Sequence, residues 1–157
     1  MFYKLYGDDG YEKNLRPFVK NIENFCCESE FQFLSHEKLH WIIPCEEKFS
    51  FREFYFIDKK VLVFNRQLWD KVMRIVDADE IFQIPVVIEK CGEQHYYTIV
   101  IPSRISCFDE KGRISEHDVG RYHIFKSSDK NDNAIYLSET LMNELKIFRE
   151  LKFKGVV

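Results

Sequence analysis

The chain has 157 residues, of which 45% are hydrophobic, 31% are charged and 16% are aromatic, and its formal net charge is −3. At this length a single domain can bury a self-sufficient core. The small net charge disfavours a nucleic-acid binder, because such proteins need a clustered basic surface. The high aromatic content favours sheet-rich packing.

The sequence predicts a cytoplasmic protein that makes no membrane contact. A secretory signal needs an unbroken apolar core, but the first residues include the charged side chains Lys4, Asp8 and Asp9. No apolar run approaches the roughly 18 to 20 residues of a membrane helix. The cysteines are Cys26, Cys27, Cys45, Cys91 and Cys107. We expect them to be reduced, since an odd number cannot pair completely within one chain and no secretory signal precedes them.

The first 60 residues show weak periodicity. Phe2–Tyr6 alternates as a strand does, and the GDDG run at 7–10 has the composition of a tight turn. Loops and short elements are expected from 11 to 45. The aromatic segment 51–58 is expected to be extended.

The stretch from Val61 to Asp109 begins with a predicted strand and helix. The run VLVF at 61–64 has no polar residue, which predicts a strand that is buried on both faces. Asn65 follows in the position of a helix N-cap. Apolar residues three and four positions apart then predict an amphipathic helix that buries Leu68 and Val72.

The same stretch continues with a predicted hairpin. The run IFQIPVVI at 81–88 predicts a strand, in which Pro85 marks a bulge, an end or an edge because it lacks the N–H of a ladder bond. Residues 90–93 have turn chemistry, and the chain returns antiparallel to Pro102. Residues 104–109 are expected to be extended, 111–120 to form a polar loop, and 121–126 to form a further strand.

The segment Ala134–Val157 repeats the strand-helix-strand pattern. Ser138 takes the place of the cap Asn65, and Leu141 and Leu145 take the places of Leu68 and Val72. Two copies are too few for a solenoid. We therefore predict one α+β domain with a mainly antiparallel sheet, on which two strand-helix-strand units pack.

One set of residues could bind zinc. A His-x3-His pair on a helical turn, together with thiolates, can form a tetrahedral site. The candidates are Cys26, Cys27, His36, His40 and Cys45. The set lacks a Cys-x2-Cys knuckle, and adjacent cysteines do not converge easily on one ion, so surface histidines near buried thiols are the favoured interpretation.

Cys107 is the best candidate for a catalytic nucleophile. It could act with His95, His117 or His123 and with Asp109, as in a small Cys-His enzyme. Its neighbours in ISCF are apolar, however, and such surroundings raise the pKa of a thiol. A packing role is favoured. No Gly-rich phosphate loop occurs, and we expect no cofactor.

The basic run near the C-terminus could form a platform for single-stranded nucleic acid. It contains Lys146, Arg149, Lys152 and Lys154, with Phe148 and Phe153 among them. In LKFKGVV, however, Leu151 and Phe153 alternate with the lysines, as in a half-buried strand. The strand is the favoured interpretation.

The order of these pieces over residues 61–157 resembles family eleven of the polymorphic-toxin immunity proteins, a family of bacterial immunity proteins. The matching residues are Asn65, Ile84-Pro85-Val86, Tyr96-Tyr97, Cys107-Phe108-Asp109 with Ser115, and Ser138 with Gly155. Residues 1–60 form a divergent part, in which 11–50 match no element of the family.

The resemblance implies a cytoplasmic, non-enzymatic protein that binds and neutralises a cognate bacterial toxin by direct contact. From the residues themselves we expect no cofactor, no metal, no nucleic acid and no membrane partner. If the toxin is basic, acidic side chains would accelerate the encounter. We expect the contributing side chains to be Asp77, Asp79 and Glu80, or Glu116 and Asp118 in the polar loop.

Overall fold

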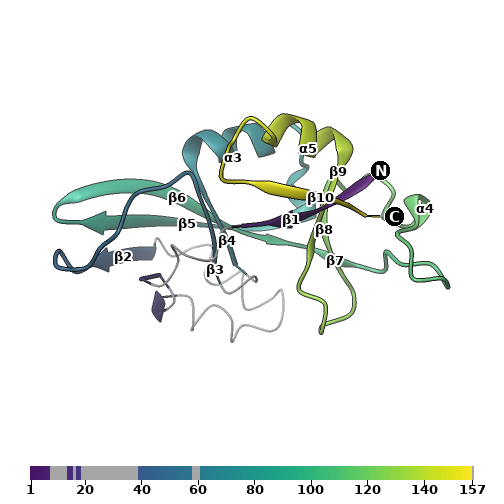
Figure 1. Ribbon diagram of the computed structural model, residues 1–157, viewed down its shortest axis with the longest axis horizontal. Coiled ribbons are helices and arrows are strands. Elements are labelled where there is room, and N and C mark those ends of the chain that lie inside the picture. The colour runs from purple at the N-terminus through teal and green to yellow at the C-terminus, as the bar shows by residue number, and fades with distance from the viewer. Residues whose placement is uncertain (8–13, 16, 19–38, 58–60, 157) are drawn as a thin grey trace.

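The protein is a single-domain α+β fold in which strands dominate (Figure 1). The computed structural model describes residues 1–7, 14–15, 17–18, 39–57 and 61–156. Within these residues the strands form two five-stranded, mostly antiparallel sheets. The predicted fold class is confirmed. No helix in the described part of the chain is long and apolar enough to cross a membrane.

The first sheet has the strand order β10-β1-β9-β8-β7. Its strands are β1 (Phe2–Tyr6), β7 (Arg104–Ile105), β8 (Ile124–Ser127), β9 (Ile135–Ser138) and β10 (Lys152–Val156). The second sheet has the order β2-β5-β6-β4-β3. Its strands are β2 (Leu39–Ile43), β3 (Phe54–Ile57), β4 (Val61–Asn65), β5 (Ile81–Lys90) and β6 (Glu93–Pro102). The first sheet has one parallel pair, β7–β8. The second sheet also has one, β2–β5.

Two helices lie side by side on one face of the sheets (Figure 1), namely α3 (Arg66–Met73) and α5 (Glu139–Leu145). Both begin at the predicted cap. Asn65 Oδ1 accepts a hydrogen bond from the Leu68 N–H at 2.9 Å, and Ser138 Oγ accepts one from the Leu141 N–H at 3.2 Å. Each bond satisfies an N–H that has no partner inside its helix. The two predicted N-caps are confirmed.

The two strand-helix-strand units share one topology. In the first unit, β4 and β5 flank α3 in sequence and lie on either side of β6 in the sheet. In the second unit, β9 and β10 flank α5 and lie on either side of β1. The middle strand is antiparallel to both neighbours in each case, so the outer strands are parallel. The strand β1 is therefore the middle strand of the second unit, just as β6 is the middle strand of the first unit.

The backbone around each cap extends this equivalence. The Asn65 N–H donates to the Glu53 carbonyl at 2.8 Å, and the Ser138 N–H donates to the His123 carbonyl at 2.9 Å. Glu53 directly precedes β3, and His123 directly precedes β8. The strands β3 and β8 thus occupy equivalent positions beside β4 and β9.

The main hydrophobic core lies beneath α3 and α5 and takes residues from both sheets. The four predicted core residues, Leu68, Val72, Leu141 and Leu145, are exposed by 1% or less. Full burial of such a side chain stabilises the fold by about 1.5 to 3 kcal/mol relative to exposure. The predicted helix registers are therefore confirmed.

Separate cores cover the opposite faces of the two sheets. In the second sheet this core includes Leu15, Trp41, Tyr55 and Ile99. In the first sheet it includes Cys107, Val119, Phe125 and Tyr136. The strand β4 is buried along Val61–Phe64, because it faces one core on each side. This confirms the prediction from its unbroken apolar run.

A two-residue turn joins β5 and β6, as predicted. Cys91 and Gly92 both have positive φ, at 53° and 82°, which is the conformation that matches the twist of hairpin strands. Lys90 and Glu93 flank the turn as the first pair of the ladder. In such a hairpin the flanking pair exchanges both backbone hydrogen bonds, and the pairs then alternate along the ladder.

This alternation explains the position of Pro85. Pro85 lies opposite Thr98 in a pair that does not exchange hydrogen bonds. Its nitrogen therefore faces away from β6, toward the side on which β2 pairs. Among the described residues, pairing with β2 begins only at Val86. Pro85 thus removes no ladder bond there, as the predicted edge position requires.

Two expectations about local structure are wrong. His40, which the zinc candidate placed on a helical turn, belongs to β2 because it pairs with Val87 on β5. The expected loop at 111–120 contains the short helix α4 (Glu116–Val119). Ser115 caps α4, since its Oγ accepts from the Asp118 N–H at 3.3 Å. The S-x-x-D pattern at this position is a helix-start signal that the sequence already contained.

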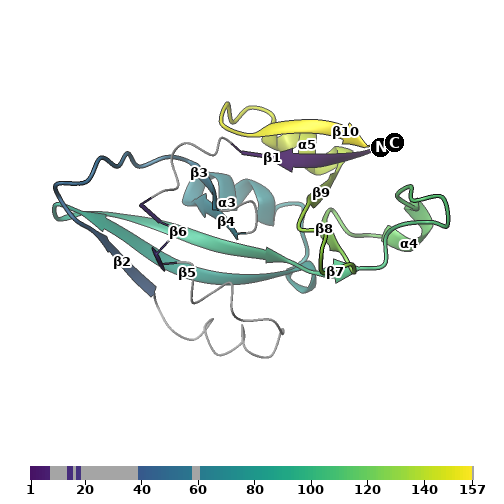
Figure 2. The same ribbon diagram turned by 60° about the horizontal axis from the view of Figure 1, so that its bottom comes forward.

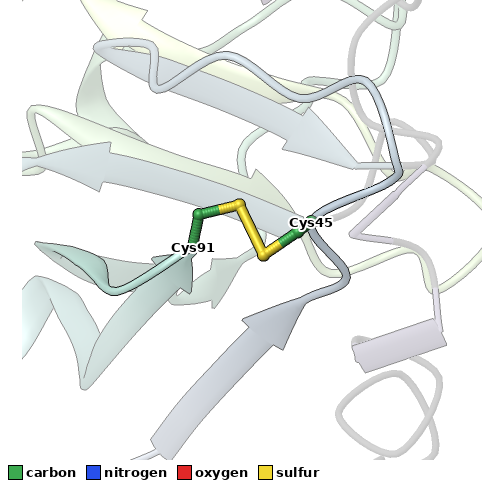
Figure 3. Close-up of a disulfide and its surroundings, with 2 residues drawn as sticks. All are labelled: Cys45 and Cys91. Carbon is green, nitrogen blue, oxygen red and sulfur yellow. A yellow bond between two sulfur atoms is a disulfide. The ribbon is translucent and has the colours of Figure 1, made fainter.

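A disulfide joins Cys45 to Cys91 (Figure 3). The Cα atoms are 5.3 Å apart. Ile43 at the end of β2 lies opposite Lys90 at the end of β5, and this pairing brings the two cysteines together. The expectation of reduced thiols is therefore wrong for this pair. In the described part of the chain Cys107 is the free cysteine, whereas Cys26 and Cys27 lie outside the described residues.

Candidate binding site

The predicted acidic residues come from two segments that the structure brings together. The first is the 3-10 turn η1 (Ala78–Glu80) with the preceding Asp77, and the second is α4. The Arg121 side chain, just beyond α4, forms an ion pair with Asp79. The His123 N–H donates to the Glu80 carboxylate. These contacts hold η1 beside residues 121–123, which follow α4.

Four of the five carboxylates are exposed. They are Asp77, Asp79, Glu116 and Asp118, which together are called the acidic surface below. The Asp79 and Glu116 side chains are 55% and 80% exposed. The Asp79–Arg121 pair is also exposed, and such pairs contribute little to stability. The carboxylates of the acidic surface are thus accessible to a partner.

Glu80 is the exception, because it is fully buried. One carboxylate oxygen accepts from the Asp77 N–H at 2.7 Å and the other accepts from the His123 N–H. Its backbone carbonyl accepts from the Ser103 N–H at 2.9 Å. The expectation of a solvent-exposed carboxylate at Glu80 is wrong, since the D-x-x-E pattern folds it back as in a capping box. Glu80 supports the acidic surface from beneath.

The residues that carry the family resemblance build the scaffold. Cys107 is buried, and its carbonyl accepts from the Ser115 N–H at 2.8 Å. Asp109 Oδ1 accepts from the N–H groups of Lys111 and Arg113, each at 2.9 Å. The Arg113 N–H and then the Lys111 N–H lower the pKa of Asp109. The Cys-Phe-Asp triplet thus shapes the turn that leads into α4.

The candidate catalytic residues do not assemble around Cys107. Burial raises the pKa of its thiol, so little thiolate forms at neutral pH. His95 lies on β6 in the second sheet. Its ring stacks on the Phe51 ring, with 3.9 Å between the two ring centroids. His117 lies on α4, and His123 Nδ1 is 2.7 Å from Ser138 Oγ. This arrangement supports the predicted packing role of Cys107.

The zinc candidates that fall within the described residues are His40 and Cys45. His40 lies on a strand, where its Nε2 is 3.7 Å from a Glu89 oxygen. The sulfur of Cys45 is in the disulfide. No group of three or more His, Cys, Asp or Glu side chains converges within the described part of the chain. Cys26, Cys27 and His36 lie outside it.

A pocket of about 430 Å³ opens where β4 passes into α3. Residues 51–53, 65–67 and 94–97 line it. The Tyr97 hydroxyl, which donates to the Arg52 carbonyl at 2.7 Å, fixes one wall. Burial raises the pKa of Tyr97 to about 12, so this phenol stays protonated at neutral pH. The lining segments lie far apart in sequence, and no local motif announced the pocket.

The basic run near the C-terminus has the predicted strand alternation. Lys152 and Lys154 on β10 are exposed, whereas Leu151 is buried and Phe153 is partly buried. Leu151 and Phe153 pack against the main core. The strand interpretation of LKFKGVV is therefore confirmed.

No protein-family model matches this sequence, and a search of curated proteins finds no relative. The resemblance to the immunity-protein family is thus carried only by the residues quoted for it above. The structure shows where those residues lie in the scaffold and that the acidic surface is exposed.

Proposed function

We propose that this protein is an immunity protein that binds a cognate bacterial toxin and neutralises it by direct contact. One observation carries the proposal. Most residues that match the family pattern shape caps, turns and core, whereas the four carboxylates of the acidic surface are not part of that pattern. The buried Glu80 supports the segment that carries Asp77 and Asp79, and Ser115 caps the helix that carries Glu116 and Asp118. A scaffold that presents contact residues outside the family pattern suits a protein whose partner varies.

The acidic surface would act mainly on the rate of association. Complementary charge steers two proteins toward a productive encounter, and this steering weakens as salt screens the charges. A basic toxin, such as a nuclease, would meet the carboxylates Asp77, Asp79, Glu116 and Asp118 first. A specific interface buries about 800 Å² on each partner, so other side chains would complete it.

The first experiment tests neutralisation in cells. The product of the adjacent upstream gene is expressed with and without this protein, and growth is measured. We expect growth to stop without the protein and to resume with it. The Cys107→Ser variant should rescue growth as well as the unchanged chain does, whereas a Cys107-centred enzyme would lose its activity. Absence of any rescue by the unchanged protein would exclude the proposal for this pair.

The second experiment tests the acidic surface. We expect the fourfold variant D77K/D79K/E116K/D118K to associate with the toxin about tenfold more slowly at low salt, and with little difference at high salt. A matched control reverses four exposed carboxylates elsewhere and has the same net charge. It is E46K/E47K/D70K/E144K. Equal slowing in both variants would show that net charge, and not this surface, steers the encounter.

The proposed compartment is the cytoplasm. A cytoplasm reduces most exposed disulfides, so the Cys45–Cys91 bond that the structure contains would there be opened to two free thiols in most molecules. Thiol labelling of the protein in lysed cells under trapping conditions measures this directly. A fully oxidised pair in growing cells would argue for an oxidising compartment instead.

A further inference from the structure

Three lysines meet on the face of the first sheet that points away from α5. In the antiparallel pair β1–β10, Lys4 lies directly opposite Lys154, and Tyr6 lies opposite Lys152. Alternation along the strands places all four side chains on one face. Lys152 and Lys154 are exposed, and Lys4 is partly exposed. Lys4, Lys152 and Lys154 are called the basic strand face below.

The described residues cover only part of this side of the sheet. Leu5 and Phe153 point to the other side, where they pack in the main core under α5. On the same side as the lysines, Phe2 and Val156 pack with Val119 of α4 and its surroundings. Among the described residues, this packing reaches the Phe2–Val156 pair. The basic strand face begins at the next pair on the same face, Lys4–Lys154.

The arrangement of the lysines is locally unfavourable. Like charges directly opposite each other on neighbouring strands destabilise a sheet. Within the described residues no acidic side chain forms an ion pair with Lys4, Lys152 or Lys154. The recorded partner of Lys4 is the Tyr6 ring, with Nζ 5.4 Å from the ring centroid. Among the described residues, no carboxylate thus compensates these three positive charges.

Protection against aggregation explains only part of this pattern. Lysines on an outer strand discourage a second sheet from pairing with it, which accounts for Lys152 and Lys154 on β10. Lys4 lies on β1, which is enclosed between β10 and β9 and presents no open edge. A charge that weakens an interior strand without a compensating contact is the kind of local conflict that marks functional positions.

The basic strand face adjoins an open sheet edge. In the described part of the chain β10 is the outermost strand of its sheet (Figure 2) and pairs with β1 on its inner side. Every second residue of an outer strand directs its N–H and C=O groups away from the sheet. An extended segment can form main-chain hydrogen bonds with such an edge.

We propose that β10 is a docking edge for an extended acidic segment of a partner protein. The segment would add a strand beside β10 and place carboxylates next to Lys152 and Lys154, with Lys4 behind them. Opposite charges on neighbouring strands attract, so docking relieves the repulsion that the free sheet retains. This inference does not depend on toxin binding, because it involves another surface and the opposite charge.

Charge decides against two other occupants. A second copy of β10, paired across a two-fold axis, would bring lysines against lysines. Single-stranded nucleic acid binds through aromatic rings on which bases stack. The exposed ring beside these lysines is Tyr6, and the Lys4 ammonium already lies over it. Carboxylates on an extended peptide satisfy both the lysines and the strand edge.

The test uses the full chain and a short synthetic peptide that alternates aspartate with valine. Its controls are a lysine-valine peptide and an oligothymidylate. We expect the acidic peptide to bind and to shift the backbone amide resonances of β10 more than those of the second sheet. The lysine-valine peptide should not bind. No binding of the acidic peptide, or tighter binding of the oligonucleotide, would overturn the proposal.

Substitutions then assign the binding to the basic strand face. We expect K4Q/K152Q/K154Q to weaken peptide binding by about tenfold. The matched control K48Q/K111Q/K130Q removes three exposed lysines elsewhere and should change the affinity by less than about twofold. We also expect K4Q to raise the thermal midpoint of the free protein, because it removes the cross-strand repulsion. Equal weakening in both triple variants would show that overall charge alone attracts the peptide.

Discussion

The two strand-helix-strand units have the same topology, caps and buried helix positions, but they are completed differently. The middle strand of the first unit is β6, which follows β5 through a two-residue turn. The middle strand of the second unit is β1, from the opposite end of the chain. The first unit therefore closes through local contacts, and the second closes only when distant segments meet, which is the slower kind of event in folding. Similar architecture thus does not require similar connectivity.

The outer faces of the units differ as well. Behind the first unit, the face opposite α3 packs a large core that includes Trp41 and Tyr55, and a disulfide ties β2 to the hairpin. Behind the second unit, the described residues cover only part of the face opposite α5, which carries Lys4 and Lys154. The comparison shows where the molecule is reinforced and where it has surface left for a partner.

The largest expected effect comes from truncating equivalent core residues. Leu68→Ala and Leu141→Ala should each lower the free energy of unfolding by about 2 to 5 kcal/mol, because each leaves a cavity in the main core. The measurement is chemical denaturation, with the exposed substitutions Gln67→Ala and Thr140→Ala as controls. A difference above about 2 kcal/mol between the two leucines would break the proposed equivalence of the units.

Removing the disulfide should lower the stability of the whole domain and should loosen the first unit most. The variant C45S/C91S opens a loop with a sequence separation of 46 and should lose about 2 to 4 kcal/mol of stability. Hydrogen exchange should speed up more in β2 and at the β5–β6 turn, where local opening becomes easier, than in β1 and β10. As a control, reductant should destabilise the unchanged protein and have no effect on the variant.

Removing the helix caps should have a smaller effect. Asn65→Ala and Ser138→Ala should each lower the free energy of unfolding by about 0.5 to 2 kcal/mol. Ser138→Ala should have the larger effect, because Ser138 Oγ also bonds to His123 Nδ1. Asn65→Asp keeps the cap acceptor and serves as the control in denaturation experiments. Equal losses for the two alanine variants would show that the histidine bond contributes nothing.

The last expected effect is confined to high pH. Burial raises the pKa of Tyr97 from 10.0 to about 12 in the folded protein, so the folded state binds more protons than the unfolded state between these values. The contribution of Tyr97 to the free energy of unfolding therefore has its full value below pH 10 and falls as pH rises toward 12. We expect Tyr97→Phe to reduce this fall when unfolding is followed across the range. An unchanged slope would mean that Tyr97 ionises normally in the folded state.

Sequence reasoning predicted the features that depend on neighbouring residues. Asn65 and Ser138 are caps because their short polar side chains reach an N–H three residues ahead. Residues 90–93 form the hairpin turn because Gly92 adopts a positive φ without steric cost, and Cys91 before it adopts a positive φ as well. The spacing of Leu68 and Val72 predicted which helix face is buried. Each of these depends on local backbone geometry.

It missed features that depend on distant pairing. His40 was assigned to a helical turn, but its pairing with Val87 on β5 makes it part of a strand. The exposed carboxylate expected at Glu80 is buried because it binds the His123 N–H, far away in sequence. Neither partner can be inferred from a local pattern in a single sequence.

The same division holds for the fold and for the surfaces proposed to bind partners. Sequence alone determined the strand-helix-strand repeat, its caps and its buried faces, since hydrogen bonds and apolar spacing within a short window decide them. Tertiary structure decided that β1 completes the second unit, that Cys45 meets Cys91, and that Lys4 lies opposite Lys154. These juxtapositions arise from strand pairing across the whole chain. They also place the exposed charges on the two surfaces that are proposed here to bind partners.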